Sequence, residues 1–305
     1  MTTVNGVLAH TSRGDRGQSR TALLMLSPSL LLYAAFVAVP VLGSLTLAFV
    51  EWDLLTPPRF VGFENFARLA GDATMLRATV NTFVFAIATV IIHLVGAVAL
   101  ALALNRPMNR LVQKFTSAAI FFPVLLSWSA VALLWKYVLD PNFGFVNHYL
   151  GELGISAPNW FADENTALLA MIGLDVWQSL GYTMVIILAG LQGIQPSLYE
   201  AAKLDGAGPI RQFWSVTVPL LSPTLLFASI ISFIGAFQIF EPMFIITRGG
   251  PADSTISLVQ DVYYTAFRDF SMGEASAKSL ILVGVMLVVT LLQLGLSKKW
   301  VNYDR

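Results

Sequence analysis

A short polar segment between two apolar stretches combines residue types that could form a docking helix. It reads PSLYEAAKLDGAGPIRQF over residues 196–213. Ser197 and Glu200 have the spacing of a capping box, which predicts a helix that starts at Leu198. Gly206 is a poor helix residue and a good helix terminator, so this helix is expected to be about two turns long.

A helix of that length needs a partner surface, because isolated helices shorter than about 12–15 residues are marginal in water. The small side chains of Ala201 and Ala202 would let another protein approach the helix backbone closely. Pro219 and Pro223 follow, and we expect them to kink the start of the next apolar stretch. No Gly-x-x-x-x-Gly-Lys-Ser/Thr motif occurs in the chain, so a nucleotide would have to be hydrolysed by another protein.

Four polar residues within a later apolar stretch share one face of the predicted helix. Asp175, Gln178, Ser179 and Tyr182 follow the spacing i, i+3, i+4, i+7. Polar groups at membrane depth are costly and usually face a cavity or another helix. A carboxylate, an amide, a hydroxyl and a phenol would suit the hydroxyls of a sugar, but such side chains also hold helices together. The residues alone leave both interpretations open.

Other apolar stretches carry further candidates for the same path. They are Trp128, Ser232, Gln238 and Glu241. Glu241 falls near the end of its stretch, where solvent could also satisfy it. His93 is expected to be an interior histidine rather than part of a site.

The composition indicates a membrane protein. Of 305 residues, 56% are apolar and 12% are charged, against about 25% charged residues in an average soluble domain. The net charge of zero excludes a global basic field for nucleic acid. The chain has no cysteine and only three scattered histidines, so thiolate or histidine-rich metal sites are not expected.

Six stretches are long and apolar enough to cross a bilayer, which needs about 20 such residues per helix. They lie near Leu23–Val50, Thr79–Leu104, Phe115–Tyr137, Ala167–Gly190, Ser215–Phe240 and Leu280–Leu296. We therefore expect an all-α integral membrane protein with six transmembrane helices. Buried helices of a soluble protein are the alternative, but six nearly uncharged spans are hard to solvate.

Basic residues in the connections predict the orientation, because cytoplasmic loops are enriched in Lys and Arg. The bases that precede the first span, fill the second and fourth connections and occupy the tail outnumber those on the other side. Both termini are therefore expected in the cytoplasm. The predicted organisation is a cytoplasmic segment 1–22, a permease domain 23–297 that contains the loop 196–224, and a cytoplasmic tail 298–305.

The loop resembles the EAA loop of ABC importer permeases. The sequence EAAKLDGAG, with Pro219 and Pro223 at the family's spacing beyond it, carries the resemblance. The six-span pattern and the sequence GGPADST at residues 249–255 are similar to the sugar-importer branch, in particular the maltose-type and glycerol-3-phosphate-type permeases. The resemblance covers about residues 20–300 and implies a type I ABC importer-like fold in a bacterial or archaeal cytoplasmic membrane.

The resemblance also implies a mechanism and partners. The EAA loop would be a coupling helix seated in a cleft of a separate ATPase subunit. The residues assigned to it are Glu200, Ala201, Ala202, Lys203, Asp205 and Gly206. The implied partners are a second homologous permease, two ATPase subunits, an extracytoplasmic substrate-binding protein, a carbohydrate-type substrate and the lipid bilayer. The chain itself would be no enzyme and would hold no cofactor, since ATP and Mg would be bound by the ATPase.

Three alternatives are kept beside the importer of a sugar or oligosaccharide. The first is an importer of glycerol-3-phosphate or a glycerophosphodiester. Asp175 argues against this substrate, because its carboxylate would repel a free anion. The second is an ion-coupled secondary transporter, which would favour inverted repeats and has no use for a docking helix. The third is an intramembrane enzyme, but no catalytic constellation is recognisable at neighbouring positions.

Overall fold

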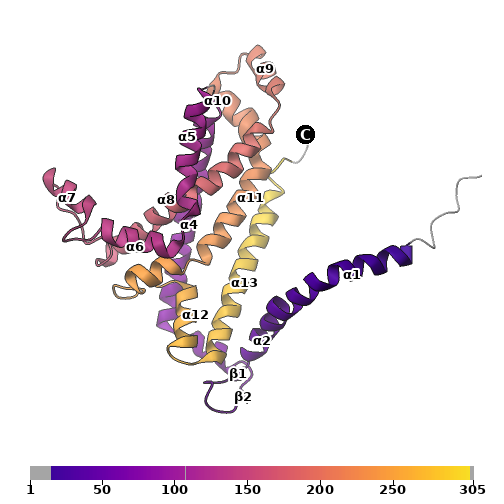
Figure 1. Ribbon diagram of the computed structural model, residues 1–305, viewed down its shortest axis with the longest axis vertical. Helices are drawn as coiled ribbons and strands as arrows, with labels where there is room; N and C mark the ends of the chain where they lie inside the picture. The colour runs from indigo at the N-terminus through magenta and orange to yellow at the C-terminus, as the bar shows by residue number, and fades with distance from the viewer. Residues whose placement is uncertain (1–14, 107, 303–305) are drawn as a thin grey trace, which may run out of the picture.

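The computed structural model describes residues 15–106 and 108–302, with side chains from Thr21 onward. Helices account for about three quarters of this part of the chain, as expected for an all-helical fold (Figure 1). The α-helices and strands are α1 Asp15–Tyr33, α2 Val39–Leu47, β1 Val50–Glu51, β2 Arg59–Phe60, α3 Glu64–Leu69, α4 Ala73–Leu104, α5 Arg110–Phe121, α6 Trp128–Val138, α7 Phe145–Glu152, α8 Glu164–Gln192, α9 Pro196–Leu204, α10 Pro209–Gln212, α11 Val218–Phe237, α12 Leu258–Phe267 and α13 Met272–Ser297. Short 3-10 or π-helical turns at Ala34–Ala38, Phe122–Leu125, Phe213–Thr217 and Met243–Thr247 lie between them.

Five helices among the described residues are long and apolar enough to cross a membrane, and six if one bent pair counts as a span. The five are Thr21–Leu47, Ala73–Leu104, Glu164–Gln192, Pro209–Phe237 and Met272–Ser297. Each overlaps one of the six stretches expected from hydropathy. The prediction of an all-helical membrane fold is confirmed.

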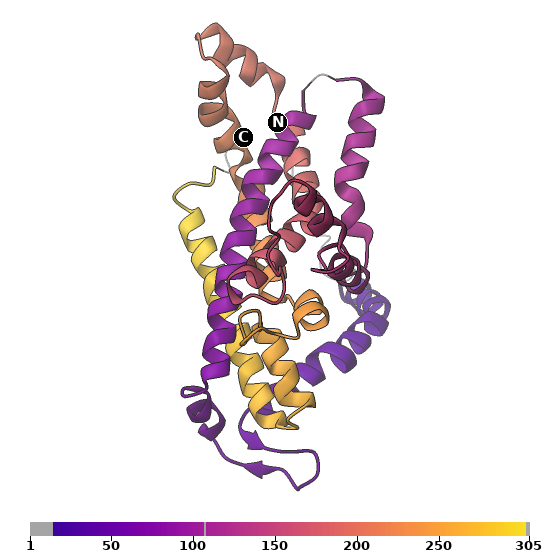
Figure 2. The same ribbon diagram turned by 90° about the vertical axis from the view of Figure 1, so that its left-hand side faces the viewer.

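The core of the bundle forms where α4, α8 and α11 pack along their length (Figure 2). One apolar cluster around Phe85 and Phe237 lies toward one end, and a second around Met184 and Leu221 lies toward the other. Gly190 brings α8 and α11 into close contact, because a Cβ there would overlap the side chain of Thr224. Polar residues on these three helices are therefore held in fixed positions.

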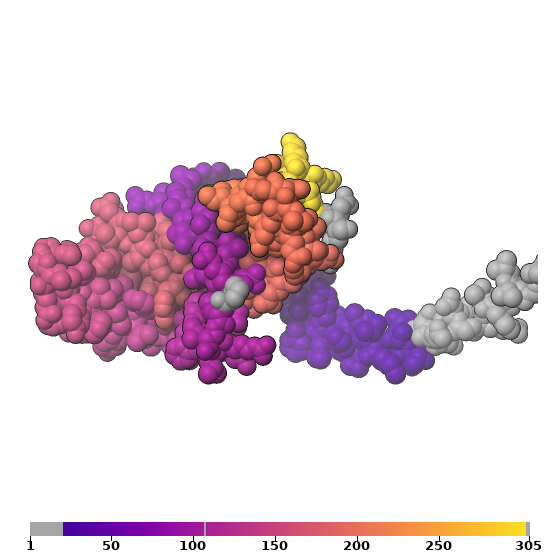
Figure 3. Space-filling view, turned by 90° about the horizontal axis from the view of Figure 1, so that it is seen from above, coloured from indigo at the N-terminus to yellow at the C-terminus, as the bar shows by residue number. Residues whose placement is uncertain are grey.

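The first span stands apart from this bundle. None of its most apolar window is buried by the rest of the chain, and Figures 1 and 3 show α1 extending away from the other helices. Leu24, Met25 and Phe36 are each more than 70% exposed. A helix that is this apolar requires lipid or another subunit around it.

The third expected span, Phe115–Tyr137, is not a straight helix. The segments Arg110–Leu125 and Trp128–Val138 meet at an angle of 100°, and α6 runs sideways (Figure 1). Pro123 contributes no N–H to a helix, and Leu126 and Ser127 adopt extended backbone angles. The continuous apolar run hides this break from a hydropathy argument.

Two π-helical turns each end two residues before a proline. Ala34–Ala38 precedes Pro40, and Phe213–Thr217 precedes Pro219. A proline inside a helix lacks an N–H and its ring crowds the preceding turn, so the backbone widens locally. The expected disturbance at Pro219 thus takes the form of a π-turn at the start of the fifth span.

The ends of the bundle separate the connections into two groups. The start of α5, the helices α9 and α10, and the C-terminal end of α13 lie toward one end, and the β1–β2 hairpin and the α12–α13 turn lie at the other (Figure 1). The sequence assigns the first group to the cytoplasm. The grouping agrees with alternating spans, while the direction across the membrane and the domain limits stay predictions, and residues 1–14 and 303–305 fall outside the described part.

A compact polar structure closes the hairpin end. β1 and β2 pair antiparallel, with Val50 opposite Phe60. Asn65 on α3 is 1% exposed and donates from Nδ2 to the carbonyls of Ala48 and Val50 at 2.8 and 3.0 Å. Gly273 at the start of α13 lies against the same strand, since a Cβ there would overlap the Val50 carbonyl oxygen. This end of α13 is therefore anchored to the hairpin.

Candidate coupling helix and polar path

The predicted docking helix exists as α9, but it begins earlier than expected. Its N-cap is Gln195, Pro196 is the first helical residue, and no side chain caps the N-terminus. The expected capping box of Ser197 and Glu200 is therefore wrong. Pro196 has the φ angle of a first helical residue and holds Gln195 in an extended conformation, so Ser197 already lies inside the first turn.

The end of α9 is as predicted. Gly206 has φ +78°, a left-handed conformation that glycine adopts without a Cβ penalty. The N–H of Ala207 donates to the Ala202 carbonyl at 2.9 Å, and the N–H of Gly206 donates to the Lys203 carbonyl at 3.0 Å. This pair of bonds is a Schellman motif, and α10 starts at Pro209 directly after it.

The surface of α9 is open to a partner. Of the six predicted coupling residues, Glu200, Ala201, Lys203, Asp205 and Gly206 are exposed and Ala202 is half-buried. Leu204 is 90% exposed, although it is a large apolar side chain. The helix projects from the end of the bundle (Figure 1). An exposed leucine on a projecting short helix indicates a protein-binding surface.

The polar face of α8 is only partly available to a substrate. Asp175 is 6% exposed, and its Oδ2 lies 3.4 Å from Nε2 of His93 on α4. Gln178 is equally buried and donates from Nε2 to the carbonyl of Leu126, at the break between α5 and α6, at 3.4 Å. Ser179 donates to Gln178 Oε1 at 2.8 Å. Asp175 and Gln178 thus connect α8 with its neighbours, and Ser179 bonds to Gln178 within α8.

Tyr182, the fourth residue of this face, is 46% exposed. Close to it in sequence, Thr183 shares a hydrogen bond of 3.4 Å with Ser232 of α11. Ser232 is half-buried, as is Trp128 at the start of α6, whereas Gln238 and Glu241 beyond the end of α11 are exposed. The structure thus links Ser232 to α8 but leaves Gln238 and Glu241 outside the buried polar contacts.

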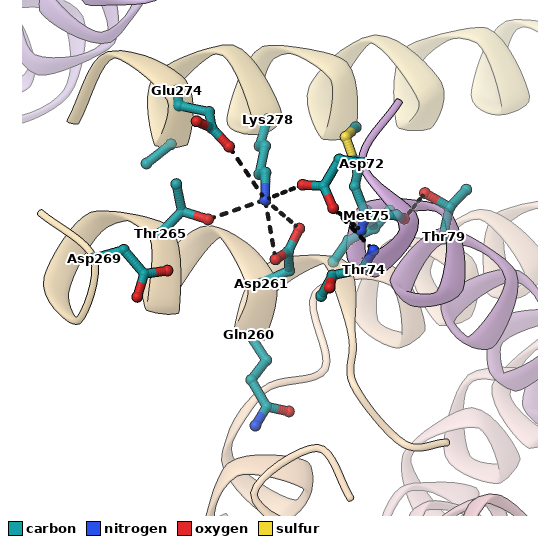
Figure 4. Close-up of polar contacts among 12 residues, drawn as sticks. Asp72, Thr74, Met75, Thr79, Gln260, Asp261, Thr265, Asp269, Glu274 and Lys278 are labelled. Carbon is teal, nitrogen blue, oxygen red and sulfur yellow. Dashed lines mark hydrogen bonds and ion pairs between the residues drawn. The ribbon is translucent and has the colours of Figure 1, made fainter. Parts of the chain in front are cut away.

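One buried cluster was not anticipated from the sequence. Lys278 on α13 is 3% exposed, and its Nζ lies 2.9 Å from a carboxylate oxygen of Asp72 and 2.9 Å from one of Asp261 (Figure 4). Thr265 adds a hydrogen bond at 3.0 Å and Glu274 lies 3.8 Å away. The cluster ties α13 to α12 and to the N-terminus of α4.

The two aspartates of this cluster respond differently to their surroundings. Burial raises the pKa of Asp261, and the nearby Lys278 only partly opposes this effect. Burial also acts to raise the pKa of Asp72, but the hydrogen bonds from Lys278 and from the Met75 N–H outweigh it and lower the pKa. The signal available in the sequence was a lysine two residues before the uncharged run Leu280–Leu296. Its two closest partners, Asp72 and Asp261, lie far from it in the chain and could not be paired by spacing.

Comparison with known proteins answers the question of family. The model of the family "Binding-protein-dependent transport system inner membrane component" matches residues 94–301, about two thirds of the chain. The chain belongs to this family. It is thus the non-catalytic, translocating permease subunit of a binding-protein-dependent ABC importer of the sugar type, a multi-pass protein of the inner membrane whose family binds no cofactor itself. The ion-coupled transporter and the intramembrane enzyme are excluded.

Individual relatives cover nearly the whole permease. A probable ABC transporter permease, YurN of Bacillus subtilis, is 32% identical over 90% of this chain and 95% of its own length. The sulfoquinovosyl glycerol permease SmoG of Agrobacterium fabrum is 32% identical over 90% of each chain. The sn-glycerol-3-phosphate permease UgpA of the same organism is 30% identical over 92% of this permease and 95% of its own chain.

Solved structures agree with the fold. A chain of a bacterial ABC transporter that imports the acidic polysaccharide alginate superposes with a TM-score of 0.83. It is 22% identical and covers 93% of this permease and 97% of its own chain. At that identity the likeness concerns the fold alone.

Proposed function

We propose that this permease translocates a sugar or oligosaccharide, driven by ATP hydrolysis in a separate ATPase subunit that grips α9. The observation that carries the proposal is the combination of an exposed Leu204 with the exposed Glu200, Lys203 and Asp205 on a short projecting helix. Isolated helices of this length are marginal in water, so a partner surface would stabilise α9 beyond its own contact with the bundle. Closure of two ATPases on ATP would then move α9 and tilt the spans attached to it.

The partners follow from the surfaces that the chain leaves uncovered. The unburied first span Thr21–Leu47 supports a second, homologous permease against which α1 packs. The end with the β1–β2 hairpin and the segment 249–255 would face the substrate-binding protein, since it lies opposite α9 (Figure 1). The complete importer would contain two permeases, two ATPase subunits and one binding protein.

The substrate class is supported by the family branch and by uncharged polar groups on the exposed side of the path. Tyr182 is exposed and Ser232 is half-buried, and both offer hydroxyls. Asp175 contacts His93, so its role would be to hold α8 against α4 rather than to bind substrate directly. The runner-up substrate is glycerol-3-phosphate or a glycerophosphodiester, which the relative UgpA favours.

The decisive experiment reconstitutes the importer and identifies its substrate. Mass spectrometry of the ligand that copurifies with the cognate binding protein gives the substrate, which is then offered with ATP to proteoliposomes that hold the full complex. We expect uptake that requires ATP, the ATPase and the binding protein. Uptake without the ATPase would disprove ATP-driven import, and a phosphorylated copurifying ligand would favour the runner-up.

A further inference from the structure

A hydrogen bond joins the docking helix to the fifth span. The hydroxyl of Tyr199 on α9 lies 3.0 Å from Oγ1 of Thr217. Tyr199 is half-buried, whereas the other large side chains of α9, Leu198 and Leu204, are exposed. Thr217 is 3% exposed and is the last residue of the π-turn that leads into α11. The contact thus connects the surface helix to a buried position in the bundle.

The behaviour of the Thr217 hydroxyl distinguishes this contact from ordinary helix geometry. Threonine in a helix commonly donates to the carbonyl three or four residues earlier. Thr79, Thr82 and Thr89 of α4 do so. Among the hydrogen bonds of the described residues, Thr217 has Tyr199 as its side-chain partner instead. The π-turn places this hydroxyl toward α9.

The two chain connections of α9 are short and contain glycine. Residues 193–195 link it to α8, and a loop with Gly206 and Gly208 leads to α10. Backbone hydrogen bonds at Gly193 and at Ala207 hold these connections. Within the part of the chain that the structure describes, the Tyr199–Thr217 bond is the only side-chain hydrogen bond from α9 to a membrane span.

The receiving element is one continuous helical segment, which carries the π-turn Phe213–Thr217 and the prolines Pro219 and Pro223 near its start. The segment Pro209–Phe237 forms one helical body that crosses the bundle, and Gln212 closes the preceding loop by donating to the Ala207 carbonyl at 2.7 Å. A force applied at Thr217 therefore acts near one end of the fifth span. A force that only rotated α9 about Gly193 and Gly206 would leave the fifth span in place.

We propose that Tyr199 is a positioning residue of the transport cycle, which makes α9 and the fifth span move as one body through Thr217. The inference rests on the proposed function, because it needs an ATPase that moves α9. The inference adds a specific path for the movement, from α9 through the hydroxyls of Tyr199 and Thr217 into α11. Loss of either hydroxyl would let α9 follow the ATPase while the fifth span lags behind.

The test uses Tyr199→Phe, Thr217→Val and the double variant, which remove hydroxyls with little change of shape. Thr217→Ser keeps the hydroxyl, and Tyr149→Phe removes one from the exposed helix α7 as a control. The chain has no cysteine, so spin labels are placed on this subunit alone at Leu55→Cys in the hairpin loop and at Phe227→Cys on the fifth span, both exposed positions. The reconstituted complex is measured with and without the ATP analogue adenylyl imidodiphosphate.

In the parent complex the analogue is expected to shift the distance between the labels. Each hydroxyl deletion should lower the ratio of shifted to unshifted molecules about 2- to 10-fold, the effect of one hydrogen bond on an equilibrium. The double variant should be no worse than either single one, Thr217→Ser and Tyr149→Phe should behave as the parent, and analogue binding and thermal unfolding should be unchanged.

Two results would overturn the inference alone, and a third would overturn the proposed function as well. Single variants that respond as the parent would show that the bond transmits nothing. Additive effects in the double variant would show that the two hydroxyls act separately. If the parent complex itself gave no nucleotide-dependent shift, the proposed function would fail, and the role of Tyr199 with it.

Discussion

Asp72 forms an ion pair with Lys278 on α13 and at the same time caps the N-terminus of α4. One carboxylate oxygen accepts hydrogen bonds from the backbone N–H groups of Thr74 and Met75 and so caps α4, while the other lies 2.9 Å from Lys278 Nζ on α13. The negative charge also suits the positive end of the α4 dipole. A single side chain therefore fixes where α4 begins and where α13 stands beside it.

Replacing Lys278 should test the strength of this arrangement. In Lys278→Met the buried Asp261 and the partly buried Asp72 lose their cation, and removing one partner of a buried ion pair costs about 3–5 kcal/mol. We expect a clearly lower thermal unfolding temperature of the purified permease. Lys299→Met, at an exposed position near the C-terminus, serves as the control. An equal effect of the two substitutions would contradict the structural role of the cluster.

Two glycines of α13 should respond differently to alanine. In Gly273→Ala the new methyl group would overlap the Val50 carbonyl oxygen, so the hairpin has to move away from α13. Gly284 has no neighbour within 4 Å, and alanine there should stabilise the helix by up to about 1 kcal/mol. Thermal unfolding of the two variants should change in opposite directions. A stable Gly273→Ala protein would mean that the hairpin does not rest on α13 as described.

The crossing of α8 over the break in the third span gives a second pair of glycines. A Cβ at Gly181 would overlap the Ile120 carbonyl oxygen, whereas a Cβ at Gly173 on the same helix would meet open space. Gly181→Ala should therefore separate α5 from α8 and impair both stability and uptake. Gly173→Ala should leave both intact. Comparable uptake by the two variants, measured at equal protein levels, would argue against close packing at this crossing.

The docking surface of α9 should be separable from folding. Glu200→Lys reverses a charge on an exposed side chain, so the bundle should stay folded while transport is lost. Gly206→Pro should act similarly, because proline cannot adopt the positive φ found there. The readout is ATP hydrolysis by the complex and its stimulation by the loaded binding protein. Stimulated hydrolysis at the parental rate in Glu200→Lys would remove this residue from the coupling surface.

The spans and the docking helix were predictable because their signals are local. A run of about twenty apolar residues predicts a membrane span at that place in the chain. Gly206, shortly before Pro209, likewise predicts a helix end at its own position. The start of α9 was missed because two local signals competed, and Pro196 took the first helical position from the capping box of Ser197 and Glu200. Spacing alone does not tell which signal prevails.

What the sequence could not predict depends on contacts between distant segments. The face shared by Asp175, Gln178, Ser179 and Tyr182 is present on α8, but His93 on α4 and the carbonyl of Leu126 decide which members are buried. The Lys278 cluster similarly needs three helices to meet. Helical periodicity tells on which face of its helix a side chain lies. It does not tell which neighbouring helix that face contacts.

The break after Leu125 also bears on the bilayer itself. The 12 residues of α5 and the four of the following 3-10 turn rise about 26 Å together, less than the roughly 30 Å of a hydrocarbon layer. The peptide groups of Leu126 and Ser127 therefore leave the helix at a depth where lipid tails offer no hydrogen bonds. Gln178 donates to the Leu126 carbonyl, the Leu126 N–H donates to the Pro123 carbonyl, and the Ser127 carbonyl accepts from the Val131 N–H, so protein groups rather than lipid supply these hydrogen bonds. A thicker host membrane would leave more of this short segment unmatched, so the break would be strained before the longer straight spans.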